Sequence, residues 1–206
     1  MKINLKAKIL VQDFEKLFKE KGYAYFTKGD YNLNIIGVRR NVENNTITNK
    51  YDDYLVVDYN TQNGRKRQIY SITTEPGLKI MIKPINSKGT AILAPGQYRS
   101  VYKIDKHNGK YDALCQRNGP VKVYRDGNKD KKYDLNPKQT ETGYFGINIH
   151  RSNETWTRET IDGYSAGCQV FNDPKEFLSF MSLVKKSASL YGNKFTYTLL
   201  DEDELN

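Results

Sequence analysis

The sequence has 206 residues, of which 33 are Lys or Arg and 24 are Asp or Glu, so that the formal net charge is +9. This length suits one domain of medium size with a sizeable core, and an aromatic share of 12% argues against wholesale disorder. No segment approaches the roughly 18 consecutive apolar residues that cross a bilayer as a helix, which excludes a membrane-spanning helix.

The N-terminal segment, residues 1–31, is predicted to be a helical extension of a larger domain. A helix over Ile9–Glu20 is indicated by apolar residues that share one helical face: Leu10, Phe14, Leu17 and Phe18. Gly22 follows as a suitable stop. Charges recur every few residues from the first position onward, and there is no continuous apolar stretch, so no classical secretion signal is expected.

Residues 32–206 are predicted to form the main domain, which begins as a series of short strands. The candidate strands are Leu33–Val42, Tyr54–Tyr59, Arg67–Thr73, Gly96–Ile104, Tyr111–Gln116, Pro120–Arg125 and Tyr144–His150. Turn dipeptides separate several of them: Asn63-Gly64, Pro76-Gly77, Lys88-Gly89, Asn108-Gly109 and Asn118-Gly119. Short strands at regular spacing indicate a mainly β fold, either a β-sandwich or a barrel-like core.

One helix is predicted near the C-terminus. Asp173 is a suitable N-cap, Pro174 fits the first helical position, and Glu176 completes a capping box. One helical face is apolar, formed by Phe177, Phe180, Met181, Val184 and Ala188. Gly192 is a good residue to end this helix, and the alternating run Lys194–Leu200 predicts a final strand.

The two cysteines and two histidines lie in different settings. Cys115, in a strand-like run, is expected to be a small buried hydrophobe, and His107, in a turn, is expected to be a solvated loop residue. His150 ends a half-buried strand, where position alone favours a structural role. Cys168 follows Gly167 in the run SAGC, where a turn can direct backbone N–H groups at a bound oxygen. A nucleophilic cysteine there needs a nearby base and a depressed thiol pKa.

Three segments in chain order resemble the L,D-transpeptidase catalytic domain, also called the YkuD-like fold. They are DYLVVDYNTQNGRKRQIYSITTEPG, KGTAILAPGQYRSVYKI, and GINIH followed by SAGC, with Cys168 eighteen residues after His150. Together they cover roughly residues 51–172, and the last segment is the specific one. The histidine precedes the cysteine, as in that family and unlike papain-like or NlpC/P60-type peptidases.

The resemblance implies a role for each residue of the motif. Cys168 would be the nucleophile, His150 its general base, and Ser165 the residue that shapes the turn, while Gly167 and Cys168 would supply oxyanion N–H donors. The implied substrates are the stem peptides of bacterial peptidoglycan. The implied reaction passes through an acyl-enzyme thioester that an amine or water resolves.

The chain departs from the family pattern at two places. Arg151 follows the histidine where the family usually has Gly, and Val170 stands where it usually has Arg. Arg151 or Arg158 is therefore a candidate to bind a substrate carboxylate. Trp156 and Tyr164, in the same loop, are candidates to line a substrate groove or else to pack the loop onto the sheet. These departures favour a relative that cleaves peptidoglycan or a catalytically weakened one.

A second candidate site is an Asp-rich loop. Oxygen-bearing side chains with the spacing of a calcium loop are Asp126, Asn128, Asp130 and Asp134. Lys131 occupies the position that usually holds Gly, Pro137 the position that usually holds Glu, and the lysines oppose cation binding. A solvated turn is the favoured interpretation and calcium the alternative; no other cofactor is expected.

The leading hypothesis is a peptidoglycan-modifying cysteine enzyme, a transferase or hydrolase. The expected absence of a secretion signal suggests a bacteriophage endolysin or a virion-associated protein that acts at the cell wall. The basic balance favours anionic wall polymers as partners, and no nucleic-acid module supports nucleic acid. The alternatives are an amidase or endopeptidase that uses the same pair, and a non-catalytic wall-binding or structural virion module. The sequence leaves the choice between transpeptidation and hydrolysis open.

Overall fold

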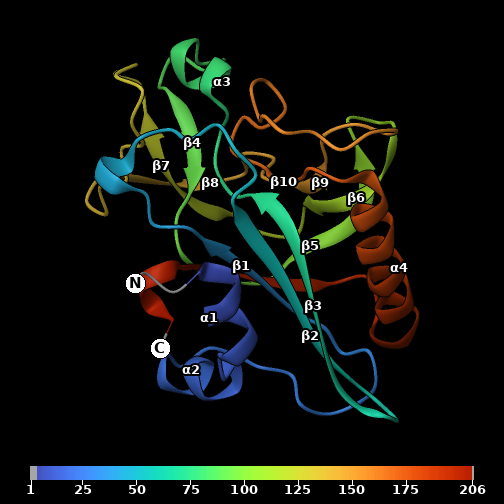
Figure 1. Ribbon diagram of the computed structural model, residues 1–206. Helices are drawn as coiled ribbons and strands as arrows, with labels where there is room; N and C mark the ends of the chain where they lie inside the picture. Colours follow the sequence, from blue (N-terminus) through green and yellow to red (C-terminus); the bar gives the residue numbers. More distant parts are fainter. Residues whose placement is uncertain (1–3, 206) are drawn as a thin grey trace.

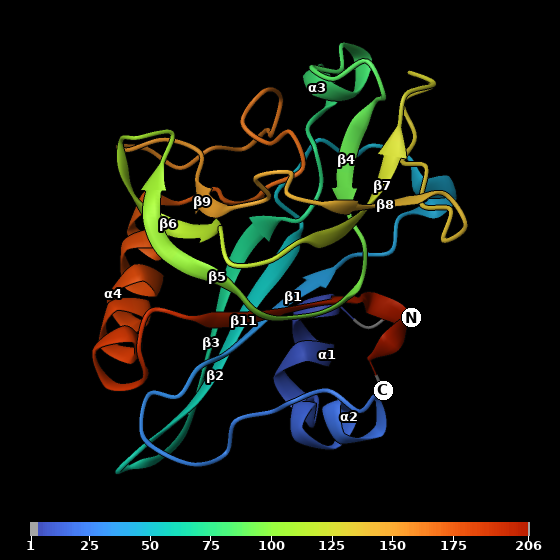
Figure 2. The ribbon, with the colours of Figure 1, turned by 180° about the vertical axis from the view of Figure 1, so that it is seen from behind.

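The computed structural model describes residues 4–205, which form an eight-stranded barrel, a smaller sheet and four α-helices (Figures 1 and 2). The barrel strands, in hydrogen-bonded order, are β1 (Asn34–Arg39), β11 (Phe195–Asp201), β5 (Gly96–His107), β6 (Tyr111–Gln116), β9 (Ile149–Arg151), β10 (Gln169–Phe171), β3 (Gly64–Thr73) and β2 (Asp53–Thr61). The second sheet comprises β4 (Thr90–Leu93), β7 (Val121–Asp126) and β8 (Thr140–Gly143). The helices are α1 (Leu5–Val11), α2 (Phe14–Glu20), α3 (Leu78–Ile82) and α4 (Pro174–Tyr191). None of them is long and apolar enough to cross a membrane.

The prediction of a mainly β, barrel-like fold is confirmed. Most neighbouring barrel strands are antiparallel, but β1 pairs in parallel with β11 and β9 pairs in parallel with β10. The main core contains side chains of the barrel strands together with Phe177 and Phe180 of α4. Tyr102 and Tyr197 are fully buried in it, edge to face, with ring centroids 5.7 Å apart.

The N-terminal segment forms two short helices, so the single helix predicted over Ile9–Glu20 is wrong. The chain leaves the helical conformation at Gln12, and the Asp13 side chain caps α2 by accepting from the Lys16 N–H. Both helices pack on the outer side of β1, β2 and β11, where their apolar side chains share a core with Ile36, Val56 and Leu200 (Figure 1). The break places both apolar faces on the barrel, which one straight helix does not achieve.

The C-terminal helix begins and ends as predicted. The Asp173 side chain accepts hydrogen bonds from the N–H groups of Lys175 and Glu176, and the helix ends at Gly192 with φ of 84°. The Glu176 carboxylate does not close a capping box, because it accepts a hydrogen bond from the Ser71 N–H of β3 instead. This contact ties the start of α4 to the barrel.

The strand predicted over Tyr144–His150 is wrong, because residues 144–148 lie outside any strand. β8 ends at Gly143 and β9 begins at Ile149. The side-chain oxygen of Gln116 accepts the N–H groups of Phe145 and Ile147, each at 3.1 Å, so these amides are satisfied without a strand partner. Four short elements, α3, β4, β8 and β10, had no counterpart among the predicted ones.

A cluster of buried charges lies where β1 leaves the barrel. The Arg39 guanidinium is buried, donates to the Leu93 carbonyl at 2.8 Å, and lies 3.5 Å from the Glu75 carboxylate. Asp53 is also buried and accepts from the N–H of Thr74 at 2.7 Å. Burial raises the pKa of Asp53 to about 6 and that of Glu75 well above its ordinary range.

The pKa of Asp53 predicts a loss of stability with rising pH. Its folded-state pKa lies above the ordinary value of 3.8, so the folded protein holds this proton more tightly than the unfolded chain does. The contribution is full below the ordinary value and lost as the pH rises through 6, a decrease of about 3 kcal/mol in the free energy of unfolding. Urea unfolding of the wild type and Asp53→Asn across this range measures it. A decline of equal size in both proteins would contradict the assignment.

Candidate active site

Cys168 lies in the turn that leads into β10. Its Sγ atom is 3.4 Å from the N–H of Asn148 and 3.4 Å from the carbonyl oxygen of Gly146, accepting from the first and donating to the second. The side chain is half-buried and packs against a small apolar cluster of Tyr51, Ile161 and Val170. The thiol is therefore held by the segment that precedes β9, which is the segment that the Gln116 side chain organises.

The turn around Cys168 requires glycine at position 167. Gly167 has φ of 114°, and a Cβ atom there would lie 2.0 Å from the carbonyl oxygen of Ala91 in β4. Ser165 is fully buried, and its hydroxyl donates to the Cys168 carbonyl at 2.9 Å while accepting the Gly167 N–H at 3.2 Å. Ser165 thus shapes the turn, as the resemblance implied.

The same hydrogen bond corrects the expected role of Gly167. Its N–H is engaged by Ser165, so in this structure it is not available as an oxyanion donor. The Cys168 N–H donates no hydrogen bond to any residue in 4–205. Of the two expected donors, only the one on Cys168 is free to face a bound oxygen.

His150 lies on β9, the strand next to Cys168. In the parallel ladder Val170 is paired with His150, so the cysteine lies two residues before the position opposite the histidine. The ring is buried, and its Nδ1 atom is 2.8 Å from the carbonyl oxygen of Arg151. Nδ1 therefore carries the hydrogen, and Nε2 is the free acceptor. In the described part of the chain the histidine makes no hydrogen bond to the cysteine.

Both groups are neutral at neutral pH. Burial raises the pKa of Cys168 to about 11, although the N–H of Asn148 acts in the opposite direction. Burial and the neighbouring His107 lower the pKa of His150 to about 3. A nucleophilic cysteine needs a depressed thiol pKa, whereas burial shifts the pKa of Cys168 in the opposite direction. A thiol and a neutral imidazole lie here in place of a preformed thiolate–imidazolium pair.

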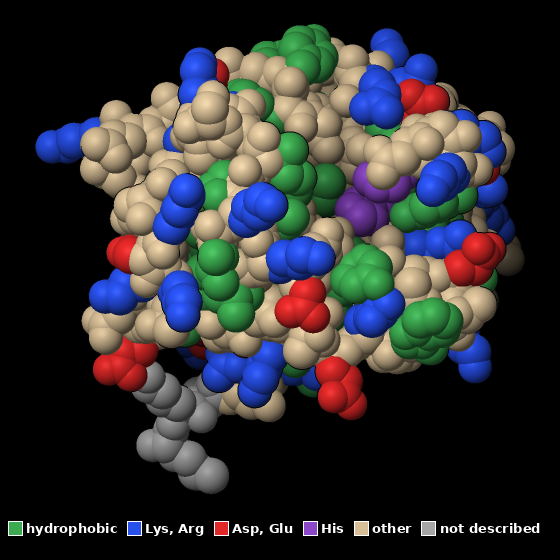
Figure 3. Space-filling view, turned by 90° about the horizontal axis from the view of Figure 1, so that it is seen from above, with side chains coloured by type: hydrophobic (Ala, Val, Ile, Leu, Met, Phe, Trp, Pro, Cys, Tyr) green, Lys and Arg blue, Asp and Glu red, His purple; other side chains and the backbone are tan. Residues whose placement is uncertain are grey.

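His107 is the residue that the sequence analysis misplaced. It is the last residue of β5, half-buried, and its ring stacks on that of His150 with centroids 4.0 Å apart and planes 19° from parallel. Its Nδ1 atom is 3.1 Å from the side-chain amide of Asn148. Figure 3 shows the two histidines side by side among hydrophobic and basic side chains. Only the hairpin pairing of β5 and β6 brings position 107 to this place, so local sequence carried no signal.

The loop after β9 holds the predicted substrate-binding residues. Arg151 is paired with Glu154 at 3.3 Å and lies over the Tyr111 ring at 4.4 Å, beside a cavity of about 290 Å³. Arg158 lies over the rings of both Trp156, at 5.2 Å, and Tyr164, at 4.3 Å. Trp156 is 58% exposed, so it does not pack the loop onto the sheet.

Three polar atoms near this loop are buried without a hydrogen-bond partner. They are the Tyr51 hydroxyl, Arg158 Nε and Asn172 Oδ1. Arg158 and Asn172 are joined through the backbone at 3.0 Å, and the Arg158 charge acts on the Tyr51 hydroxyl. Arg158 therefore retains an unused donor beside the apolar cluster that contains Cys168, whereas the Arg151 guanidinium is already paired.

The oxygen-bearing side chains of the Asp-rich loop form hydrogen bonds within the loop. Asp126 accepts the N–H of Asp134, Asp130 accepts the N–H of Lys132, and the Asn128 amide donates to the Asp134 carboxylate. These oxygens stabilise the turn itself. Across residues 4–205, no group of three or more His, Cys, Asp or Glu side chains is arranged to hold a metal ion.

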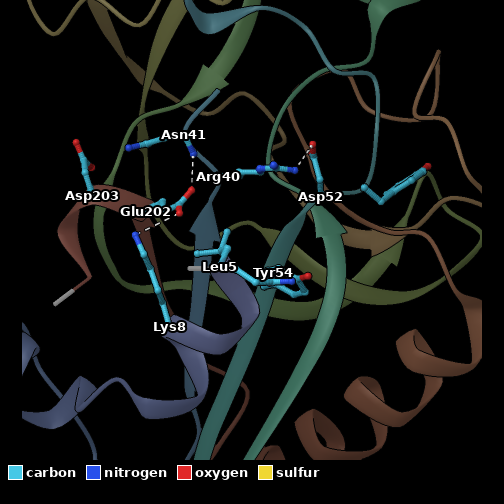
Figure 4. Close-up of a pocket in the computed structure, with 10 residues that line it drawn as sticks. Leu5, Lys8, Arg40, Asn41, Asp52, Tyr54, Glu202 and Asp203 are labelled. Atoms are coloured by element: carbon cyan, nitrogen blue, oxygen red, sulfur yellow. Dashed lines mark hydrogen bonds and ion pairs between the residues drawn. The ribbon is translucent and has the colours of Figure 1, made fainter. Parts of the chain in front are cut away.

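A cavity of about 830 Å³ lies elsewhere, between α1, the ends of β1 and β2, and the C-terminal turn (Figure 4). Four of its five charged side chains are paired, Lys8 with Glu202 at 3.3 Å and Arg40 with Asp52 at 3.6 Å, and the fifth is Asp203. Such internal neutralisation leaves little charge for a ligand. Cys168 and His150 lie apart from this cavity, the cysteine in the turn before β10 and the histidine on the neighbouring strand β9.

Comparisons of the chain with protein-family models, with curated protein sequences and with solved structures find no match.

Proposed function

We propose that this protein is a cysteine-dependent acyltransferase or hydrolase that acts on the stem peptides of bacterial peptidoglycan. The observation that carries the proposal is the parallel pairing of β9 and β10, which places His150 on the strand beside Cys168 in a sequence whose motif resembles that of L,D-transpeptidases. The turn that holds the thiol also leaves the Cys168 N–H free to face a developing oxyanion.

The proposed reaction begins with attack of Cys168 Sγ on the carbonyl carbon of a stem-peptide amide. The sulfur–carbon bond forms, the carbon–nitrogen bond breaks, and the thiol proton passes through His150 Nε2 to the departing amine. The products are a thioester and a free amine. A second amine then resolves the thioester to a new amide, or water resolves it to a carboxylic acid, and either step returns the proton to the thiol.

The neutral resting state determines how the nucleophile forms. With the pKa of Cys168 near 11 and that of His150 near 3, proton transfer accompanies attack instead of preceding it. A bound substrate that excludes water and supplies a carbonyl oxygen to the Cys168 N–H favours that transfer. This implies low reactivity of the thiol towards small electrophiles and higher reactivity once a substrate is bound.

The surroundings of the pair suit an anionic peptide. Basic side chains outnumber acidic ones over the chain, and both are spread over the face that carries the histidines (Figure 3). Within residues 4–205 Arg158 makes no ion pair, whereas Arg151 is paired with Glu154, so we propose that the Arg158 guanidinium receives a substrate carboxylate. The exposed Trp156 ring offers an apolar surface beside it.

The direct test is to trap the acyl-enzyme. The protein is incubated with purified peptidoglycan fragments that carry tetrapeptide stems, and the mass of the intact protein is measured after rapid quenching. We expect a mass increase equal to that of the transferred acyl group, located on the peptide that contains Cys168 and removed by hydroxylamine. Adding a free amino acid as acceptor then separates transpeptidation from hydrolysis by the products formed.

An unmodified protein and unchanged fragments, from a sample that remains folded, would contradict the proposal. In that case the non-catalytic wall-binding module is the better interpretation. Sedimentation of the protein with intact peptidoglycan sacculi tests that alternative separately, because binding requires no thiol chemistry.

A further inference from the structure

His107 contacts both halves of the proposed catalytic pair. Its ring lies face to face with that of His150, with centroids 4.0 Å apart and an interplanar angle of 19°. Its Nδ1 atom is 3.1 Å from the side-chain amide of Asn148, whose backbone N–H donates to Cys168 Sγ. His107 thus contacts the base directly and is linked to the thiol through Asn148.

We propose that His107 is a positioning residue whose neutral ring orients His150 and stabilises the imidazolium that forms when His150 takes the Cys168 proton. This inference rests on the proposed function. A neutral aromatic face attracts a cation stacked on it, whereas a protonated ring at the same distance repels one. His107 therefore permits the proton transfer when it is neutral and opposes it when it is charged.

The burial of the two rings and the groups around them indicate that His107 is protonated before His150. His107 is half-buried whereas His150 is buried, so the more exposed His107 takes up the first proton of the pair. Burial and the charge of Arg117 lower the pKa of His107 from 6.5. Tyr111 of β6 faces both rings, at 5.6 Å from that of His107.

Three basic side chains nearby are already paired, whereas Lys110, whose N–H donates to the His107 carbonyl, makes no ion pair within residues 4–205. Arg117 is bound to Asp105 at 2.8 Å, and Arg151 is bound to Glu154 at 3.3 Å. On α4, the Lys185 ammonium is bound to Asp112 at 2.9 Å. No carboxylate makes an ion pair with either histidine within residues 4–205, so nothing there offsets a proton on His107.

On the acid side of the pH–rate profile, the reaction rate of Cys168 is therefore expected to follow the protonation of His107. The fraction of the pair present as thiolate and imidazolium is independent of pH while His107 stays neutral, since proton transfer within the pair takes up no proton from solution. Below the pH at which His107 is protonated, this fraction falls. The rate at which a stem-peptide fragment acylates Cys168, a reaction that uses this proton transfer, should therefore decline on that side without any change in His150 itself.

The test compares three proteins that carry Cys115→Ala, so that Cys168 is the sole thiol: position 107 is His, Phe or Ala. The rate of Cys168 acylation by purified peptidoglycan fragments with tetrapeptide stems is measured by mass spectrometry of the quenched protein at intervals between about pH 4 and pH 8. Phe keeps a stacking ring that cannot be protonated, whereas Ala removes the ring. Thermal unfolding of each protein confirms that it is folded over this range.

We expect the ratio of the His107→Phe rate to the parent rate to rise as the pH falls below 6.5, reaching at least about tenfold at the acid end. His107→Ala should be slower than His107→Phe at every pH, because His150 loses its stacked partner. Profiles that coincide for all three proteins would overturn the inference and leave His107 as packing.

A fourth protein, His150→Ala, keeps this result separate from the proposed function. If none of the proteins is acylated, the proposed function fails. If the fragments acylate His150→Ala as fast as the parent, the pair itself fails. If Cys168 reacts slowly in His150→Ala but the residue at position 107 does not change the rate, the catalytic pair is supported and only the proposed role of His107 is contradicted.

Discussion

Replacing Cys168 with Ala is expected to lower the turnover of peptidoglycan fragments by at least about a thousandfold, because the variant has no atom that can form the thioester. The side chain is half-buried and makes two hydrogen bonds of 3.4 Å, so its loss should reduce the free energy of unfolding by no more than about 1 kcal/mol. Fragment turnover followed by liquid chromatography, together with urea unfolding, measures both effects.

Cys115→Ala is the matched control for this variant. Cys115 is fully buried in the main core, lies on β6, and donates to the Asp105 carbonyl at 3.5 Å rather than to the Cys168 turn. The same substitution there should reduce stability and leave turnover within about twofold of the wild type. Equal losses of activity in the two variants would indicate that the effect comes from the fold and not from the thiol.

Replacing Gly167 with Ala is expected to reduce the free energy of unfolding by about 3 kcal/mol. The φ of 114° is unfavourable for any side chain, and the added Cβ would lie 2.0 Å from the Ala91 carbonyl oxygen, a backbone atom of β4 that cannot move alone. The turn must shift to relieve this overlap, and Cys168 shifts with it. We therefore expect fragment turnover to fall as well, even at temperatures well below the midpoint of thermal unfolding.

Gly163→Ala serves as the control in the same loop. A Cβ atom at Gly163 meets only the flexible Lys79 side chain, at 3.6 Å, and its φ lies outside the left-handed region. Its stability should stay within about 0.5 kcal/mol of the wild type. If Gly167→Ala were as harmless as Gly163→Ala, the close approach between the turn and β4 would not constrain the site.

Elements with strong local signals were predicted well. Tyr111–Gln116 and the helix that begins after Asp173 have the observed bounds or caps, because alternation, a capping side chain and Gly192 act within a few residues. The strand predicted over Tyr144–His150 was wrong because a residue distant in sequence determines the conformation there. Its alternation is that of a strand, but the side chain of Gln116, distant in sequence, takes two of its N–H groups.

The sequence by itself determined the β-rich class of the fold, the tight turn at Gly167 and the chemical types of the candidate nucleophile and base, because these depend on residue identity and short spacings. Tertiary structure decided the rest. The pairing of β9 with β10 and the β5–β6 hairpin brought His150 and His107 to Cys168, and burial in that place raised the thiol pKa. Desolvation depends on every atom that surrounds a group, and only the folded chain brings those atoms together.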